Sequence, residues 1–409
     1  MPSHTAKSKI TELALLGGPA AFSEPLHVGR PSVGDRERFL ERVNDMWDRR
    51  WFSNNGPYVR EFEDKLRGFL GVKHCIPVCN GTIAMELAIR ALDLKGEVIV
   101  PSFTFISAAH ALQWQEITPV FCDIDPKTHN LDPQKIEAMI TPRTTAIVGV
   151  HTWGRPCEVD ALTRIARRND LRLLFDAAHA FGCSHQGRAI ANFGDAEVFS
   201  FHATKFFNTF EGGAVATNDD ELAAKIRLMK NFGFQGNDNV IYIGTNGKMT
   251  EISAIMGLTG LESLDQIIQV NRQNYDLYRE LLSGCSGLTM VTYDARERCN
   301  FQYIVFEVDE SAIGLTRDDL VQLLTAENIL ARRYFFPGCH RMQPYRSFFP
   351  HAGLLLPETE RLAGRVMSLP NGTAVGAADI QQVCGLVRFA IDHAAEIRAA
   401  LQTREPALK

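Results

Sequence analysis

Short apolar runs alternate with helix-like segments through the first half of this chain. Seven runs have the length and composition of strands: residues 75–79, 97–100, 118–122, 145–150, 172–175, 198–201 and 214–217. Segments with helical periodicity lie between several of them, at 81–92, 105–115 and 158–168. Short apolar strands separated by helices are typical of a mainly parallel sheet covered on both faces. Such sheets bind ligands at the carboxyl ends of their strands.

The alternation of strands and helices is absent before this region and changes after it. Residues 1–25 resemble an N-terminal arm, and helices are expected at 35–49 and 58–70. A long helical stretch at 251–282, with a break near Ser263, precedes strands near 288–292 and 302–307 and helices near 317–327 and 377–401. We therefore predict an α/β protein with an arm (1–25), a large domain (26–264) and a smaller C-terminal α/β domain (265–409).

Composition narrows the class of protein. The 409 residues are 45% hydrophobic and 22% charged, as in ordinary globular proteins, and the length suits two domains. The net charge of -5 comes without blocks of like charge, which argues against a surface for nucleic acid or membranes. No apolar run reaches the length of a membrane span. Nine cysteines without repeated spacing predict reduced thiols, a cytoplasmic location and no metal site.

Lys205 is the candidate for covalent chemistry. It follows a predicted strand in the segment Ser200-Phe201-His202-Ala203-Thr204-Lys205, and two glycines come soon after it. A lysine that forms a Schiff base must become a neutral amine, which a partly desolvated site favours. A lysine in a surface loop would show the same local pattern.

An acidic residue ends the predicted strand at 172–175. Asp176 is followed by small residues and by His179. A carboxylate in this position can pair with a pyridinium nitrogen and make the ring an electron sink. His179 could then donate to a phenolic oxygen of the same ring. The alternatives are an Asp that caps a helix and a histidine that belongs to the core.

Three further segments suit a phosphorylated, flat cofactor. Gly81 and Thr82 open a helix after a strand, where backbone N–H groups bind phosphate, and Ser200 offers a second hydroxyl. Phe105 follows another strand and could stack on a ring. A capped helix start and a core aromatic would explain the same residues.

Taken together, these segments resemble the DegT-type family of nucleotide-sugar aminotransferases, which share the fold-type-I architecture of aspartate aminotransferase. The resemblance runs from about Asn54 to Leu369. It is carried by Asn54-Asn55-Gly56-Pro57, Asn80-Gly81-Thr82, Pro101-Ser102-Phe103-Thr104-Phe105, Asp176-Ala177-Ala178-His179, Ser200 to Lys205 and Gly244-Thr245-Asn246-Gly247-Lys248-Met249.

The resemblance implies pyridoxal 5'-phosphate as cofactor, with Lys205 as its covalent anchor and proton carrier. It also implies that Asp176 pairs with the pyridine nitrogen, that His179 approaches the ring oxygen, and that Gly81, Thr82 and Ser200 hold the phosphate. Asn246 would reach the phosphate of a partner subunit, so the resemblance implies a homodimer with shared active sites. The family often has Gln in place of His179, and this is a departure.

Within that family, the chain is most similar to enzymes that aminate carbon 4 of a dTDP-linked 4-keto-6-deoxyhexose. Besides 200–208, the segment 332–340 suggests this, since it mixes cations with aromatics that suit a sugar and a diphosphate. Arg332, Tyr334 and His340 are its candidate substrate-binding residues, although a core strand with a basic pair is an alternative. L-glutamate is the expected amino donor.

Three rival functions remain. Amination could occur at carbon 3 of a 3-keto isomer instead. Relatives that dehydrate or deoxygenate replace the lysine with histidine, so the presence of Lys205 favours amino transfer. A regulator that binds the cofactor without turnover would need a DNA-binding element, which the sequence does not show.

Overall fold

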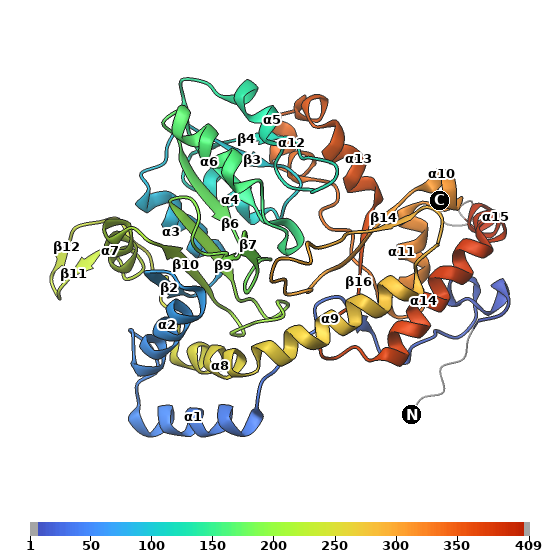
Figure 1. Ribbon diagram of the computed structural model, residues 1–409, viewed down its shortest axis with the longest axis horizontal. Coiled ribbons are helices and arrows are strands. Elements are labelled where there is room, and N and C mark those ends of the chain that lie inside the picture. Colours follow the sequence, from blue (N-terminus) through green and yellow to red (C-terminus); the bar gives the residue numbers. More distant parts are fainter. Residues whose placement is uncertain (1–6, 405–409) are drawn as a thin grey trace.

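A seven-stranded sheet lies at the centre of the larger part of the molecule (Figure 1). The structure is a computed structural model that describes residues 7–404, so the first six residues of the predicted arm and the last five of the predicted small domain lie outside the described residues. The strands of the sheet are β2 (His74–Val78), β3 (Glu97–Pro101), β4 (Thr118–Cys122), β5 (Thr144–Val150), β6 (Arg172–Asp176), β9 (Ala196–Ser200) and β10 (Gly213–Thr217).

The sheet has the order β2-β10-β9-β6-β5-β3-β4. Strand β10 runs antiparallel to β2 and β9, whereas the pairs from β9 through β4 are parallel. The predicted mainly parallel sheet is confirmed, and each predicted strand matches an observed one to within two residues.

Successive side chains of the central strands point to opposite faces, and both faces are buried. In β3, Val98 and Val100 face one hydrophobic cluster while Ile99 faces another. In β6, Leu174 joins the first cluster and Phe175 the second. This alternation of wholly apolar side chains explains why the strands read as continuous apolar runs in the sequence.

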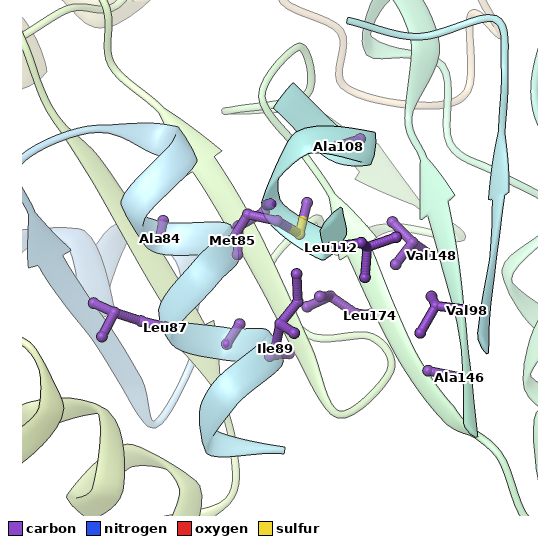
Figure 2. Packing of buried hydrophobic residues seen from close by; sticks show 14 of the residues in the cluster. Ala84, Met85, Leu87, Ile89, Val98, Ala108, Leu112, Ala146, Val148 and Leu174 are labelled. Atoms are coloured by element: carbon purple, nitrogen blue, oxygen red, sulfur yellow. The ribbon is translucent and has the colours of Figure 1, made fainter. Parts of the chain in front are cut away.

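Helices cover both faces. Figure 2 shows side chains of α3 and α4 turned toward the strands on the first face. The helices of this face are α3 (Gly81–Ala91), α4 (Ser107–Gln113) and α7 (Asp220–Met229), and α6 (Val159–Arg168) lies on the other. Helices α1 (Arg36–Arg49), α2 (Pro57–Leu70) and α8 (Glu251–Glu262) form a further layer around a cluster rich in phenylalanine.

Helix α2 starts with a cap from a distant helix. The buried Glu251 carboxylate accepts hydrogen bonds from the N–H groups of Tyr58 (2.8 Å) and Val59 (3.0 Å). These N–H groups lie in the first turn and have no intrahelical acceptor, so the carboxylate satisfies two donors and complements the positive end of the helix dipole.

The smaller C-terminal part is a second α/β unit. Helix α9 (Leu264–Leu281) continues from α8 after a break at Ser263, as predicted, and the two run end to end from one part to the other (Figure 1). The unit contains β13 (Leu288–Met290), β14 (Ile304–Val308) and β16 (Val366–Leu369) in an antiparallel sheet, with α10 (Glu310–Ile313), α11 (Arg317–Ala326), α13 (Pro357–Arg365), α14 (Ala377–Asp392) and α15 (Ala394–Arg404). The short helix α12 (Tyr345–Phe348) instead packs on the large part, where the Tyr345 ring meets Phe121 of β4.

The single helix predicted at 377–401 is wrong, because it is divided into α14 and α15. His393 leaves the helical conformation between them, with φ -110° and ψ 22°. Its ring packs on Phe389, 4.4 Å between centroids, and its Nδ1 lies 3.1 Å from the Glu396 carboxylate. The apolar pattern continues across this break, which is why the sequence did not reveal it.

The N-terminal segment packs on the small unit. Leu13 is fully buried in the core of that unit, and β1 (Leu26–His27) pairs in parallel with β15 (Ile329–Leu330). The predicted domain boundaries remain predictions. Between residues 7 and 404, no helix is both long and apolar enough to cross a membrane.

Candidate active site

A cavity of about 600 Å³ opens at the carboxyl ends of the central parallel strands. Its walls include Val150 at the end of β5, Asp176 at the end of β6 and Ser200 at the end of β9. Nine predicted site residues line it: Gly81, Thr82, Phe105, Asp176, His179, Ser200, Lys205, Arg332 and Tyr334. The topology of the sheet therefore brings together residues that lie far apart in the sequence.

The amine of Lys205 lies inside this cavity. The residue belongs to a tight loop after β9, where its N–H donates to the His202 carbonyl at 2.8 Å. Burial lowers the pKa of the lysine from its usual 10.5 to about 8, and the negative charge of Asp176 partly opposes this. Its Nζ lies 3.3 Å from the Tyr303 hydroxyl. A lysine with a lowered pKa supplies the neutral amine that covalent chemistry requires.

Asp176 is a buried carboxylate whose side chain accepts one hydrogen bond among the residues that the structure describes. Its Oδ1 accepts a hydrogen bond from the Ala178 N–H at 2.9 Å. Burial raises the pKa of the carboxyl, while the Ala178 N–H and the charges of Lys205 and His151 act in the opposite direction. A protonated ring nitrogen would add a direct counter-charge and hold the carboxylate ionised, so the pyridinium of pyridoxal phosphate fits this site.

His179 is neutral and its tautomer is defined by the backbone. Burial holds its pKa well below the usual value. Its Nδ1 lies 3.3 Å from the backbone N–H of Trp153 and accepts from it, so the proton of the ring is placed on Nε2. Trp153 has a left-handed backbone conformation, φ 63°, and its indole stacks on the imidazole with 6.0 Å between centroids. His179 is therefore prepared as a hydrogen-bond donor through Nε2.

The start of α3 forms a narrow cradle for an anion. Asn80 caps the helix, since its side-chain oxygen accepts from the Ile83 N–H at 2.8 Å. A Cβ on Gly81 would come within 2.7 Å of the Ser200 side chain, and one on Gly213 within 2.6 Å of the Asn80 backbone. The glycines thus let two loops approach closely. The N–H groups of the first helical turn have no intrahelical acceptor and favour a phosphate group.

The outer part of the cavity combines aromatic and cationic side chains. Phe105 lies in the loop before α4 with 57% of its surface exposed. The Arg332 guanidinium lies 5.3 Å from the Tyr334 ring centroid. Arg333 points elsewhere and pairs with Asp318 at 3.1 Å, since neighbouring side chains on an extended segment point to opposite sides.

Two predicted site residues do not reach the cavity. His340 is buried, with Nδ1 at 2.7 Å from the Ser102 hydroxyl and Nε2 at 2.6 Å from the Glu360 carboxylate. Because both nitrogens are already hydrogen bonded within the protein, this placement argues against its predicted contact with substrate. Asn246 is exposed and lies outside the cavity of its own chain.

Other residues of the cavity were not predicted. Tyr303, Trp153, Phe335 and the segment 27–29 take part in it or support it. Trp153 follows the end of β5, and this position after a parallel strand could have indicated in the sequence that it lies near the site. Among the described residues, no group of three or more His, Cys, Asp or Glu side chains could hold a metal ion.

Comparison with known proteins identifies the family. The profile of the DegT/DnrJ/EryC1/StrS aminotransferase family matches residues 34–388. This chain belongs to that family. Membership confirms the predicted aminotransferase class and its cofactor, pyridoxal 5'-phosphate. The buried lysine, the carboxylate and the cradle described above fit this cofactor.

Individual members of the family are similar over nearly their whole length. The dTDP-4-amino-4,6-dideoxy-D-glucose transaminase of Shigella dysenteriae is 39% identical, with 90% of this chain and 99% of the relative covered. The GDP-perosamine synthase of Caulobacter vibrioides is 36% identical, with 88% and 96% covered. The crystal structure of DesI in the presence of its TDP-sugar product superposes with a TM-score of 0.93 at 50% identity, covering 96% of this chain and 100% of DesI.

Proposed function

We propose that this aminotransferase transfers the amino group of L-glutamate to carbon 4 of a dTDP-4-keto-6-deoxyhexose and yields a dTDP-4-amino-4,6-dideoxyhexose. The observation that carries the proposal is the buried pair of Lys205 and Asp176 beyond the strand ends. The chain is also 50% identical to DesI, whose structure was determined in the presence of its TDP-sugar product. The relatives named for the same sugar support the choice of carbon 4.

The residues around the cofactor position divide the work of this reaction between binding the cofactor and transferring the proton. Pyridoxal phosphate, when bound, supplies the electron sink for the bond that breaks beside the amine. Asp176 would pair with the ring nitrogen and keep it protonated, and His179 would donate through Nε2 to the ring oxygen. The first turn of α3, at Gly81 and Thr82, binds the phosphate. Lys205, once free, moves a proton between the substrate carbon and the cofactor carbon through Nζ.

The diphosphate of the substrate requires positive charge outside the part of the cavity that holds the cofactor. Arg332 lines the cavity with its guanidinium against the Tyr334 ring, and this arrangement suits a diphosphate beside a sugar. Phe105, exposed to the same space, offers a flat apolar face to the cofactor ring.

The proposal includes a homodimer with shared sites. The hairpin of β11 (Phe234–Gln235) and β12 (Asn239–Val240) projects from the large part (Figure 1), and Val240 and Ile243 are 56% and 77% exposed. Apolar side chains gathered on a protruding element are typical of a protein interface. Asn246 follows this hairpin, is exposed and does not line the cavity of its own chain, as expected of a residue that serves a partner.

Mixing two variants, each impaired at a different residue of the site, tests whether the site is shared between subunits. Lys205→Ala removes the anchor and Asn246→Ala weakens the phosphate contact. If Asn246 acts across the dimer, unfolding and refolding the two together produces mixed dimers with one intact site, and activity returns. Activity that stays absent in mixed dimers would place Asn246 in its own subunit or outside the site.

The substrate is tested by the two half-reactions taken separately. We expect glutamate to convert the cofactor to its pyridoxamine form, which is seen in the visible spectrum. After removal of glutamate, a dTDP-4-keto-6-deoxyhexose should restore the original spectrum. A response only to the 3-keto isomer would move the reaction to carbon 3, and a response only to a GDP-linked 4-keto sugar would change the nucleotide. If glutamate and other amino donors all fail, the chain is a cofactor-binding protein without turnover.

A further inference from the structure

The amine of Lys205 has one polar neighbour in the cavity that the reaction described above does not use. The Tyr303 hydroxyl lies 3.3 Å from Nζ, and it is the only hydrogen-bond partner found for the amine among the described residues. Nζ is 6.0 Å from the centroid of the ring, so it sits at the hydroxyl edge of the phenol. The contact therefore involves the phenolic oxygen.

Tyr303 keeps its proton throughout the neutral range. Burial, Tyr334 and the nearby Asp176 raise the pKa of the phenol well above its usual value. The pKa of Lys205 is lowered to about 8, so amine and ammonium forms are both accessible near neutral pH. A protonated phenol can serve both forms, since it donates to the lone pair of the amine and accepts from the ammonium.

The phenol is also held firmly. Its ring packs against His179, 4.4 Å between centroids, and makes a T-shaped contact with Trp153, 5.5 Å between centroids. The Tyr303 carbonyl accepts from the Tyr293 hydroxyl at 3.0 Å. Contacts on both the ring and the backbone leave the hydroxyl little freedom, so its position beside Nζ is built into the fold.

Buried asparagines attach this segment to the rest of the molecule. Asn300 donates through Nδ2 to the His179 carbonyl at 2.8 Å. Asn371 donates to the carbonyls of Phe301 (2.7 Å) and Gln302 (3.2 Å). The residues just before Tyr303 are thereby fixed both to the histidine of the cofactor site and to the end of β16.

We propose that Tyr303 is a catalytic residue that orients the free amine of Lys205 during proton transfer. Nζ takes a proton from one carbon and becomes an ammonium, which donates to the phenolic oxygen. The ammonium then gives a proton to the other carbon, and the phenol O–H donates to the restored lone pair. The phenol retains its own proton, so the two transfers balance at Nζ. The proposal rests on the proposed aminotransferase function.

The test compares Tyr303→Phe with Tyr303→His in the intact holoenzyme. Phenylalanine keeps the ring and removes the single hydroxyl contact, whereas histidine retains a group that can exchange hydrogen bonds. We expect Tyr303→Phe to slow the glutamate half-reaction by about 10- to 100-fold, with a KM for glutamate within about twofold of the parent. Tyr303→His should recover part of this loss.

Tyr275→Phe is the matched control. Tyr275 is a buried tyrosine whose hydroxyl donates to the Val291 carbonyl at 3.2 Å, away from the cavity. Its variant should keep the parental half-reaction rate. If Tyr303→Phe also keeps that rate, or if Phe and His variants are equally slow with a raised KM, Tyr303 only fills space and the proposal is refuted.

A second measurement needs no substrate. The visible band of the bound cofactor reports the environment of the Lys205 nitrogen, and its pH midpoint should shift in Tyr303→Phe because a hydrogen bond to that nitrogen is lost. This midpoint can be measured even in a protein that does not react with glutamate or with a keto-sugar. An unchanged midpoint would count against the contact, whereas failure of the substrates alone would count against the proposed function.

Discussion

The lowered pKa of Lys205 makes a quantitative prediction about how the cofactor-free protein captures an aldehyde. With a pKa of about 8, roughly 9% of the amine is neutral at pH 7, against roughly 0.03% for a lysine at 10.5. Only the neutral amine attacks, and at that pH its fraction is about 300-fold higher than for an exposed lysine.

Stopped-flow mixing with pyridoxal measures how the rate of attack follows this fraction. Pyridoxal lacks the phosphate, whose own ionisation would otherwise contribute to the profile. The rate at which the visible band appears should rise about tenfold per pH unit below pH 8 and level off above it. Lys205→Ala supplies the background, since it leaves no amine at this position.

A second variant separates the effects of burial and of the Asp176 charge on the pKa of Lys205. The negative charge of Asp176 raises the pKa of Lys205, in opposition to burial. Asp176→Asn should therefore move the midpoint to lower pH. A rate that continues to rise through pH 10 in the parent, or a midpoint that Asp176→Asn moves upward, would refute this account of the site.

Three more predictions concern the frame around the site. Glu251→Ala should lower the free energy of unfolding in urea by about 1–3 kcal/mol, because two buried N–H donors lose their acceptor, and Glu251→Gln should cost less. Gly81→Ala should weaken cofactor binding in an equilibrium titration by about tenfold or more, because the added Cβ would come within 2.7 Å of the Ser200 side chain. Gly68→Ala is the control and should leave binding unchanged, since its Cβ meets nothing within 4 Å. Burial lowers the pKa of His129 to about 4. Between about pH 6.5 and pH 4 the unfolded chain therefore binds a proton at His129 that the folded chain does not. The stability of the fold should fall as the pH drops through this range. Thermal unfolding of His129→Asn, which should lose part of this acid sensitivity, checks the last of these.

The residues that the sequence revealed are those whose role follows from their local position. Asp176 directly follows an apolar strand, Gly81 opens the helix after another, and Lys205 lies in the loop after a third. Because parallel strands end at one edge of the sheet, position along the chain was enough to predict that they meet. The resemblance to the family then supplied their chemical roles.

The residues that the sequence missed or misplaced depend on contacts between distant segments. Tyr303 reaches Lys205 from the small unit, and no local pattern marks it. His340 belongs to a segment rich in cations and aromatics, and only the positions of Ser102 and Glu360 show that it faces inward. Composition describes which side chains a segment has, but it does not determine which way each one points.

The antiparallel β10 has a consequence for how the protein is made. In the sheet, β2 pairs only with β10, whose first residue is synthesised roughly 135 residues after the end of β2. A nascent chain that ends before Gly213 therefore leaves the apolar edges of β2 and β9 open, and such edges attract other chains. The loop between β9 and β10 is the one that carries Lys205, so the strand order closes only when the cofactor lysine has left the ribosome. A chain that ends before Gly213 consequently lacks both a finished sheet and the later residues, such as Tyr303 and Arg332, that line the cavity.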